Sequence, residues 1–149
     1  MDRVGIDRAC LVGHSLGGRI ALEAARRSPE RVSHLVLVSP IGFGRLSPLG
    51  FFLGTALWAI WKVARRPLPY PTLQIEMRDD RLRELGDIGV PVMIVCGRWD
   101  IFFPAWYSRR AGAAISGSTV RLFNMSGHAP HQDQPGNFNQ TVLDFLSGA

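Results

Sequence analysis

Four short apolar segments constrain the fold of this chain more than any other feature. They are residues 9–13, 35–39, 91–97 and 119–123. The first three hold almost no polar residue between the apolar ones, which is typical of strands covered on both faces of a parallel sheet. Helical patterns lie between them, at 19–27 and from Pro104 to about Ala114. We therefore expect an α/β fold, a parallel sheet with flanking helices.

A closing helix and an insertion complete this outline. Residues 137–146 form an amphipathic helical pattern, whose inward positions are Phe138, Val142, Phe145 and Leu146. Residues 41–80 differ from the rest, because glycine and proline surround an apolar, aromatic stretch there. We therefore divide the chain into a core at 1–40 and 81–149 and a helical insertion at 41–80. A short helix near residues 81–85 should lead back to the core.

Composition indicates one soluble globular domain. The chain has 149 residues, of which 46% are hydrophobic and 19% charged, and this excludes a disordered tail, a collagen-like repeat and a coiled coil. The net charge is +5, but the arginines occur in scattered pairs and form no basic run, so we expect no nucleic-acid partner. The two cysteines, Cys10 and Cys96, lie in apolar segments and predict neither a disulfide framework nor a metal cluster.

The longest apolar stretch bears on membrane association. Residues 49–64 number 16, which is shorter than the ~20 residues needed to span a bilayer. No apolar signal-peptide core follows Met1. We therefore expect no membrane span and a cytoplasmic location. An alternative is binding to a membrane surface through the apolar residues 51–61.

The break after the first apolar segment predicts a nucleophile. In Gly13-His14-Ser15-Leu16-Gly17-Gly18, a serine stands on a turn between a strand and a helix, which exposes its hydroxyl. Larger residues at Gly13 and Gly17 should clash. The N–H of Leu16, at the helix N-terminus, is the expected donor to a developing oxyanion. A purely structural glycine-rich turn is the alternative.

A serine nucleophile needs a base and an acid. His128 lies in the loop after the fourth apolar segment, and we expect it to take the serine proton. Asp100 lies in the loop after the third, and we expect its carboxylate to fix the imidazole tautomer. This chemistry requires no metal or organic cofactor. The carboxyl ends of parallel strands meet at one edge of a sheet, so Ser15, Asp100 and His128 should lie together.

Four other polar residues are alternatives. His131 lies three residues after His128, and we expect it either at the rim of the site or directly behind the residues that line it. His34 should lie at the opposite end of the sheet, and His14 should line the pocket beside the nucleophile. Asp133 is the rival acid, but it should begin the final helical region.

Together, four segments resemble the α/β-hydrolase superfamily in its cap-bearing branch. They are LVGHSLGG at 11–18, SPERVSHLVLVSP at 28–40, GVPVMIVCGRWDIFFP at 89–104 and SGHAPHQDQPGNFNQTVLDFL at 126–146. The chain order Ser15, Asp100, His128 is also that of the superfamily. The resemblance implies a serine hydrolase (serine esterase) that cleaves an ester or related acyl substrate with a catalytic triad. Carbon–carbon hydrolysis, acyl transfer and cofactor-free haloperoxidation remain open.

The resemblance also implies a substrate-binding wall. In capped hydrolases the insertion covers the active site, so 41–80 should form a cap domain with an apolar inner face. Trp58 and Trp61, three positions apart, should share one helix face. With His14, Trp99 and Phe102 they are the expected substrate-binding residues, and a hydrophobic acyl small molecule is the expected partner.

One departure from the family pattern sets a further expectation. In the family the nucleophile follows the fifth strand of about eight, whereas here it follows the first expected strand. The earlier strands and the loop that donates the second oxyanion N–H are not in this sequence, so strand 9–13 should have an exposed edge. Losing one such donor typically costs about 10²–10³ in rate. Two alternatives follow: a truncated, weakly active or inactive hydrolase remnant that acts at most by association, and a homo-oligomer or other pairing across the exposed edge.

Overall fold

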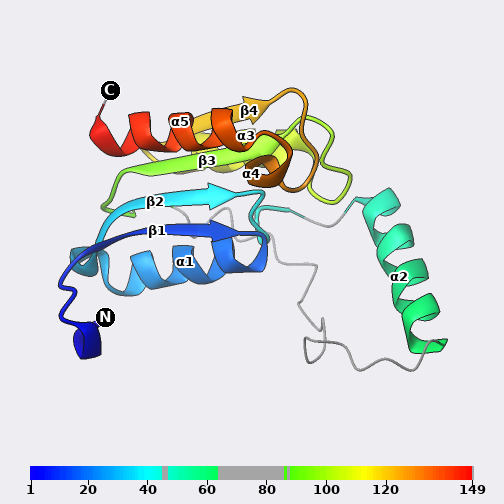
Figure 1. Ribbon diagram of the computed structural model, residues 1–149, viewed down its shortest axis with the longest axis horizontal. Helices are drawn as coiled ribbons and strands as arrows, with labels where there is room; N and C mark the ends of the chain where they lie inside the picture. Colours follow the sequence, from blue (N-terminus) through cyan, green and yellow to red (C-terminus); the bar gives the residue numbers. More distant parts are fainter. Residues whose placement is uncertain (45–46, 64–85, 87, 149) are drawn as a thin grey trace.

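A four-stranded parallel sheet forms the centre of the molecule. The computed structural model describes residues 1–44, 47–63, 86 and 88–148 (Figure 1). The strands lie in the order β1-β2-β3-β4, and each neighbouring pair is parallel. Their bounds are β1 Ala9–His14, β2 Val32–Val38, β3 Val92–Gly97 and β4 Thr119–Phe123. The expected α/β fold with a parallel sheet is confirmed.

The helices cover both faces of this sheet. Helices α1 (Leu16–Arg27) and α3 (Ala105–Ala114) lie on one face, and α5 (Pro135–Ser147) lies on the other (Figure 1). Short 3-10 turns at Asp2–Val4 and Pro29–Arg31 precede β1 and β2. Helix α4 (Pro130–Asp133) was not expected from the sequence, because four residues are too few to show a helical period.

Two elements, α1 and β2, begin three residues earlier than the sequence predicts. Helix α1 begins at Leu16, three residues before the predicted start, although Gly17 and Gly18 are poor helix formers. Strand β2 begins three residues early, because Val32 pairs with Ala9 of β1 and is buried. Pairing with β1 therefore extends β2 beyond its apolar pattern.

The core has two layers, one on each side of the sheet. Leu35 and Leu37 of β2 pack towards α1 and α3, whereas Val36 and Val38 pack towards α5. On α5, Phe138 and Val142 are buried, and Phe145 and Leu146 pack against them, as the amphipathic pattern predicted. Of the two free cysteines, Cys96 is buried and Cys10 is half-buried.

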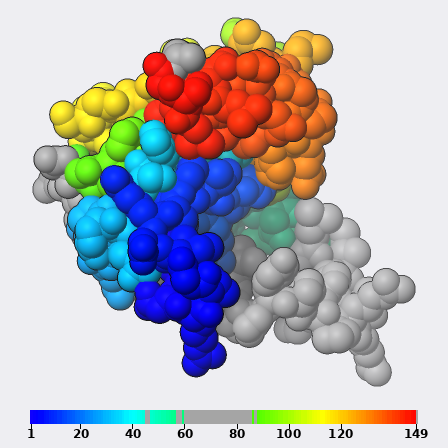
Figure 2. Space-filling model, turned by 60° about the vertical axis from the view of Figure 1, so that its left-hand side comes forward, coloured from blue at the N-terminus to red at the C-terminus, as the bar shows by residue number. Residues whose placement is uncertain are grey.

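Strand β1 lies at one end of the strand order, and its side chains are partly exposed. Val12 is 54% exposed, whereas every residue of β3 is buried. The prediction that both faces of residues 9–13 are covered is therefore wrong for the part of the chain that the structure describes. Figure 2 shows the blue β1 reaching the surface beside the red and orange α5.

Helix α2 (Pro48–Val63) lies within the predicted insertion and begins against the loop that follows β3. The Ser47 N–H donates to the carbonyl of Phe102 at 3.0 Å, and the Ser47 hydroxyl donates to the carbonyl of Ile101. The helix then extends away from the sheet (Figure 1). The short helix predicted near 81–85 lies outside the described residues, and the division into core and insertion stays a prediction. Within the described residues, no helix combines the length and hydropathy of a membrane span.

Leu37→Ala tests the core layer between the sheet and helices α1 and α3. Leu37 is fully buried in β2, so its truncation should lower the free energy of unfolding by about 2–5 kcal/mol. Leu143→Ala is the matched control on α5, where the side chain is 60% exposed, and it should cost less than about 0.5 kcal/mol. Urea unfolding of both variants measures the difference. Equal losses would contradict the assigned core.

Candidate active site

Ser15 stands on a strained turn between β1 and α1. Its φ of 53° and ψ of −118° lie where side-chain-bearing residues are rare. Its N–H donates to the carbonyl of Val38 at 2.9 Å. Its own carbonyl accepts the N–H groups of Gly18, Arg19 and Ile41 at 3.0–3.3 Å. Hydrogen bonds on both sides of the residue therefore hold the strained conformation.

Two glycines let the strand and the helix approach each other, but they are not the two that the motif suggested. A Cβ on Gly13 would lie 2.4 Å from the carbonyl oxygen of Gly17. A Cβ on Gly18 would lie 3.0 Å from the Gly13 oxygen and 3.0 Å from Pro40 Cβ. A Cβ on Gly17 would meet nothing within 4 Å, so the expectation of a clash at Gly17 is wrong. The close contact joins Gly13 and Gly18.

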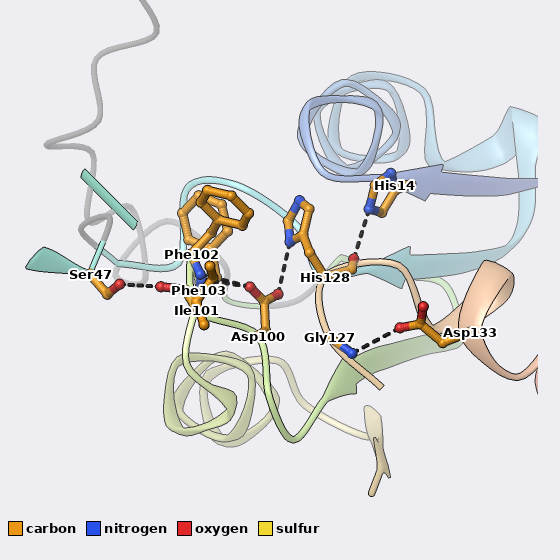
Figure 3. A network of polar contacts seen from close by, with 9 residues as sticks. All are labelled: His14, Ser47, Asp100, Ile101, Phe102, Phe103, Gly127, His128 and Asp133. Atoms are coloured by element: carbon orange, nitrogen blue, oxygen red, sulfur yellow. Dashed lines mark hydrogen bonds and ion pairs between the residues drawn. The ribbon is translucent and has the colours of Figure 1, made fainter. Parts of the chain in front are cut away.

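Asp100 and His128 form a hydrogen-bonded pair (Figure 3). The His128 Nδ1 lies 2.8 Å from Asp100 Oδ2. Asp100 is 4% exposed, and its Oδ1 accepts the N–H groups of Phe102 and Phe103 at 2.9 and 3.0 Å. Both carboxylate oxygens therefore have partners, which fixes the orientation of the group. An imidazole that donates from Nδ1 has its lone pair on Nε2, as a general base requires.

The two carboxylates near His128 have different partners. Asp133 Oδ2 accepts the N–H of Gly127 at 2.8 Å, so it binds the backbone of the histidine loop (Figure 3). Asp100 alone of these two contacts the imidazole. Asp133 is the last residue of α4, whereas the sequence pattern predicts it at the start of the final helical region.

His14 brings the serine turn and the histidine loop together. Its Nε2 donates to the carbonyl oxygen of His128 at 2.9 Å, and the two ring centroids lie 4.9 Å apart. Ser15 follows His14 directly and so lies at the same edge of the sheet. The described residues show no hydrogen bond between the Ser15 hydroxyl and His128. Such bonds are often long until a substrate is bound.

The other two histidines lie apart from the paired imidazole. The His131 ring is 4.7 Å from that of His14, and its buried Nδ1 has no hydrogen-bond partner within the described residues. His34 lies in the first half of β2, where its ring contacts Phe145 at 5.5 Å. His34 is thus remote from the carboxyl edge.

Aromatic rings flank His128 on the side of the acid loop. Phe102 and Phe103 lie 5.2 and 5.8 Å from the His128 ring centroid. Phe102 was expected from the sequence, but Phe103 was missed; the signal for it was its place directly after Phe102 in the acid loop. Trp99 is 68% exposed. Trp58 and Trp61 lie in α2, but their side chains are outside the described residues.

Leu16 is the first residue of α1, so its N–H is one of those at a helix N-terminus that lack an acceptor within the helix. This placement beside Ser15 suits a donor to an oxyanion. No group of three or more potential metal ligands occurs within the described residues.

Comparisons with known proteins show that the chain is similar to α/β hydrolases in sequence and fold. A family model described as "alpha/beta hydrolase fold" matches residues 1–66. The acetyltransferase component of the acetoin cleaving system of Cupriavidus necator is 29% identical over 188 aligned positions, which cover 99% of this chain and 48% of that protein. A 2-hydroxy-6-oxononadienedioate/2-hydroxy-6-oxononatrienedioate hydrolase of Klebsiella pneumoniae is also 29% identical, over 100% of this chain and 66% of that protein.

These matches support membership of the chain in the α/β-hydrolase superfamily. Solved structures share its fold: carboxylesterase CesB from Bacillus subtilis has a TM-score of 0.77 at 24% identity, over 99% of this chain and 63% of CesB. A meta-cleavage product hydrolase from Pseudomonas fluorescens has a TM-score of 0.78 at 22% identity, over 99% and 68% of the two chains. The chain spans about half the length of several curated relatives that it matches.

Gly13→Ala and Gly17→Ala test the turn around Ser15. The added Cβ of Gly13→Ala meets backbone, which cannot move without displacing α1, so the variant should lose about 1–3 kcal/mol of stability. Gly17→Ala enters open space in a helix and should cause no loss. Urea midpoints of the two variants give the comparison. A larger loss of stability in Gly17→Ala than in Gly13→Ala would support the motif-based prediction that a side chain at Gly17 clashes.

The pH dependence of stability tests the burial of His14. Burial lowers the pKa of His14 below its ordinary value of 6.5, and the nearby His128 and His131 lower it further, against the raising effect of its bond to the His128 carbonyl. Below about pH 6.5 the unfolded chain therefore binds more protons at this position than the folded chain, and stability falls as the pH falls. His14→Gln should lose less stability than wild type between about pH 7 and pH 5. Urea unfolding of both proteins at the two pH values measures the change in the free energy of unfolding. Equal losses in His14→Gln and wild type would contradict the prediction.

Proposed function

We propose that this chain carries the catalytic site of a serine hydrolase that acts on an ester or related acyl substrate. One observation supports the proposal above the others: a buried, fully bonded Asp100 holds the His128 imidazole at the sheet edge that also presents the strained Ser15. Strain of this kind persists where surrounding structure over-determines it, and it clusters at active sites.

The proposed reaction follows from the three side chains. The Ser15 oxygen attacks the substrate carbonyl carbon while His128 Nε2 takes the serine proton. The Leu16 N–H donates to the oxyanion that forms. His128 then returns the proton to the leaving alcohol, which leaves Ser15 acylated. A water molecule, deprotonated by the same nitrogen, attacks the acyl-enzyme, and the acid product departs as the proton returns to Ser15.

Asp100 has two tasks in this scheme. It holds the Nδ1–H tautomer, so that Nε2 faces the serine, and its negative charge stabilises the imidazolium that forms during attack. The proposed scheme uses no cofactor, because the nucleophile, the base and the oxyanion donor are all residues of the chain.

The substrate class is proposed from the walls of the site. Phe102 and Phe103 place apolar surface against His128, and α2 brings an apolar helix to the same loop. We propose a small hydrophobic acyl substrate and a cap formed by the insertion. The 2-hydroxy-6-oxononadienedioate/2-hydroxy-6-oxononatrienedioate hydrolase among the relatives is named for substrates that carry a ketone. It favours one second candidate, hydrolytic cleavage of a carbon–carbon bond next to a ketone with the same three side chains.

Labelling by a fluorophosphonate probe tests the proposal directly. The wild-type chain should be labelled at Ser15, and labelling should disappear in Ser15→Ala and in His128→Ala. Absence of labelling in a folded wild-type sample would instead favour the alternative of an inactive hydrolase remnant. A panel of short and medium acyl esters and one ketone-based carbon–carbon substrate then distinguishes the two reactions.

Asp100→Asn and Asp133→Asn distinguish the two carboxylates. Asp100→Asn cannot accept the Nδ1–H in the same way and should lower ester turnover by about 10⁴-fold. Asp133→Asn keeps an oxygen that can accept the Gly127 N–H, so it should change turnover less than about tenfold. Steady-state kinetics of both variants, with thermal unfolding as a check on folding, measure this. A reversed order would assign the acid to Asp133.

A further inference from the structure

One hydrogen bond joins the element that carries Ser15 to the loop that carries His128. His14, the last residue of β1, donates from Nε2 to the carbonyl oxygen of His128 at 2.9 Å (Figure 3). A carbonyl oxygen can only accept, so Nε2 of His14 bears the hydrogen. The sequence predicts that His14 lines the substrate pocket, but its Nε2 is bonded to the chain itself.

The two joined segments start from distant strands. Strands β1 and β4 lie at opposite ends of the strand order, with β2 and β3 between them. Neighbouring strands are about 4.8 Å apart, so the loop after β4 must cross roughly 14 Å to reach the serine turn. Any displacement of that loop changes the distance between the proposed nucleophile and the proposed base.

The histidine loop is held at its base by other contacts. Its residues 124–129 lie between β4 and α4 and form no helix or strand. The Trp99 N–H donates to the carbonyl of Ser126 at 2.9 Å, and the Gly127 N–H donates to Asp133 at 2.8 Å. Among the residues that the structure describes, the bond from His14 ties the His128 backbone directly to β1.

We propose that His14 is a positioning residue, which sets the distance between the Ser15 hydroxyl and the His128 imidazole by holding the His128 carbonyl oxygen. This inference rests on the proposed serine hydrolase function. His14 acts through His128 and takes no part in proton transfer.

The surroundings of His14 suit this role. Its ring packs between those of His128 and His131, at centroid distances of 4.9 and 4.7 Å. Burial lowers the pKa of His14 below its ordinary value, and the adjacent His128 and His131 lower it further, which favours a neutral His14. A neutral His14 keeps the bond to the carbonyl and leaves the positive charge of the catalytic cycle to His128.

His14→Leu and His14→Gln test the role of the donor. Leucine fills the space without a donor, whereas the glutamine amide nitrogen reaches close to the position of Nε2. His14→Leu should lower kcat about 10–100-fold with KM changed less than twofold, because misplacement by about 1 Å can cost 10²-fold. His14→Gln should recover kcat to within about threefold of wild type. Equal losses in both variants, or an effect on KM alone, would overturn the proposal.

His34→Leu is the matched control, since it replaces another half-buried histidine that lies away from the carboxyl edge. It should leave kcat and KM unchanged. A loss of kcat in His34→Leu equal to that in His14→Leu would mean that general destabilisation, and not the bond to His128, accounts for the effect.

Hydrogen exchange separates failure of this inference from failure of the proposed function. If wild type does not react with the fluorophosphonate probe, the hydrolase proposal fails, but the bond from His14 can still be measured. Amide exchange at Ser126 and Gly127 should accelerate at least tenfold in His14→Leu, stay near wild type in His14→Gln, and be unchanged at Phe138 and Val142 of α5. Unchanged loop exchange in His14→Leu would overturn the positioning role whatever the activity.

Discussion

The left-handed backbone of Ser15 is the constraint on which the rest of the site depends. A φ of 53° is costly for a residue with a side chain, and it persists because both neighbouring elements hold it. The Ser15 N–H bonds to β2 through Val38, and its carbonyl bonds to the first turn of α1. The close approach of Gly13 and Gly18 lets the helix fold back onto the strand. The turn is therefore as stable as the packing of β1, β2 and α1.

The buried carboxylate of Asp100 is the second constraint. Removing a charge from water costs several kcal/mol unless hydrogen bonds replace the lost hydration. Asp100 has three such bonds, from the Phe102 N–H, the Phe103 N–H and the His128 imidazole. The same bonds that offset the cost of burial fold the acid loop and orient the imidazole. The stability of the loop and the chemistry of the site thus have one physical cause.

The Ser15 turn and the Asp100 loop lie at the same edge of the sheet because β2 and β3 align the outer strands β1 and β4 in parallel. Strands β2 and β3 are buried and pair in parallel, so the loops that follow β1, β3 and β4 emerge at one edge. At that edge the His14 side chain donates to the His128 carbonyl and joins the serine turn to the histidine loop. Within the histidine segment, the Gly127 N–H donates to Asp133. A parallel sheet alone brings the loops to one edge. The polar contacts then bring the side chains to within reach of one another.

The sequence by itself determined the strand–helix alternation, the parallel sheet and the turn at Ser15, because unbroken apolar segments and a glycine-flanked serine are local signals. It also predicted that Asp100 and His128 would lie at one edge of the sheet, since each follows a recognisable apolar strand, and the two side chains do pair there. It did not reveal which glycine faces the strand, as the Gly17 expectation shows, because that depends on how the helix packs. Nor could it assign His14 to the His128 carbonyl or Asp133 to the Gly127 N–H. Those bonds join residues that are 114 and 6 positions apart, and only the folding of the sheet and its loops decides which donor meets which acceptor.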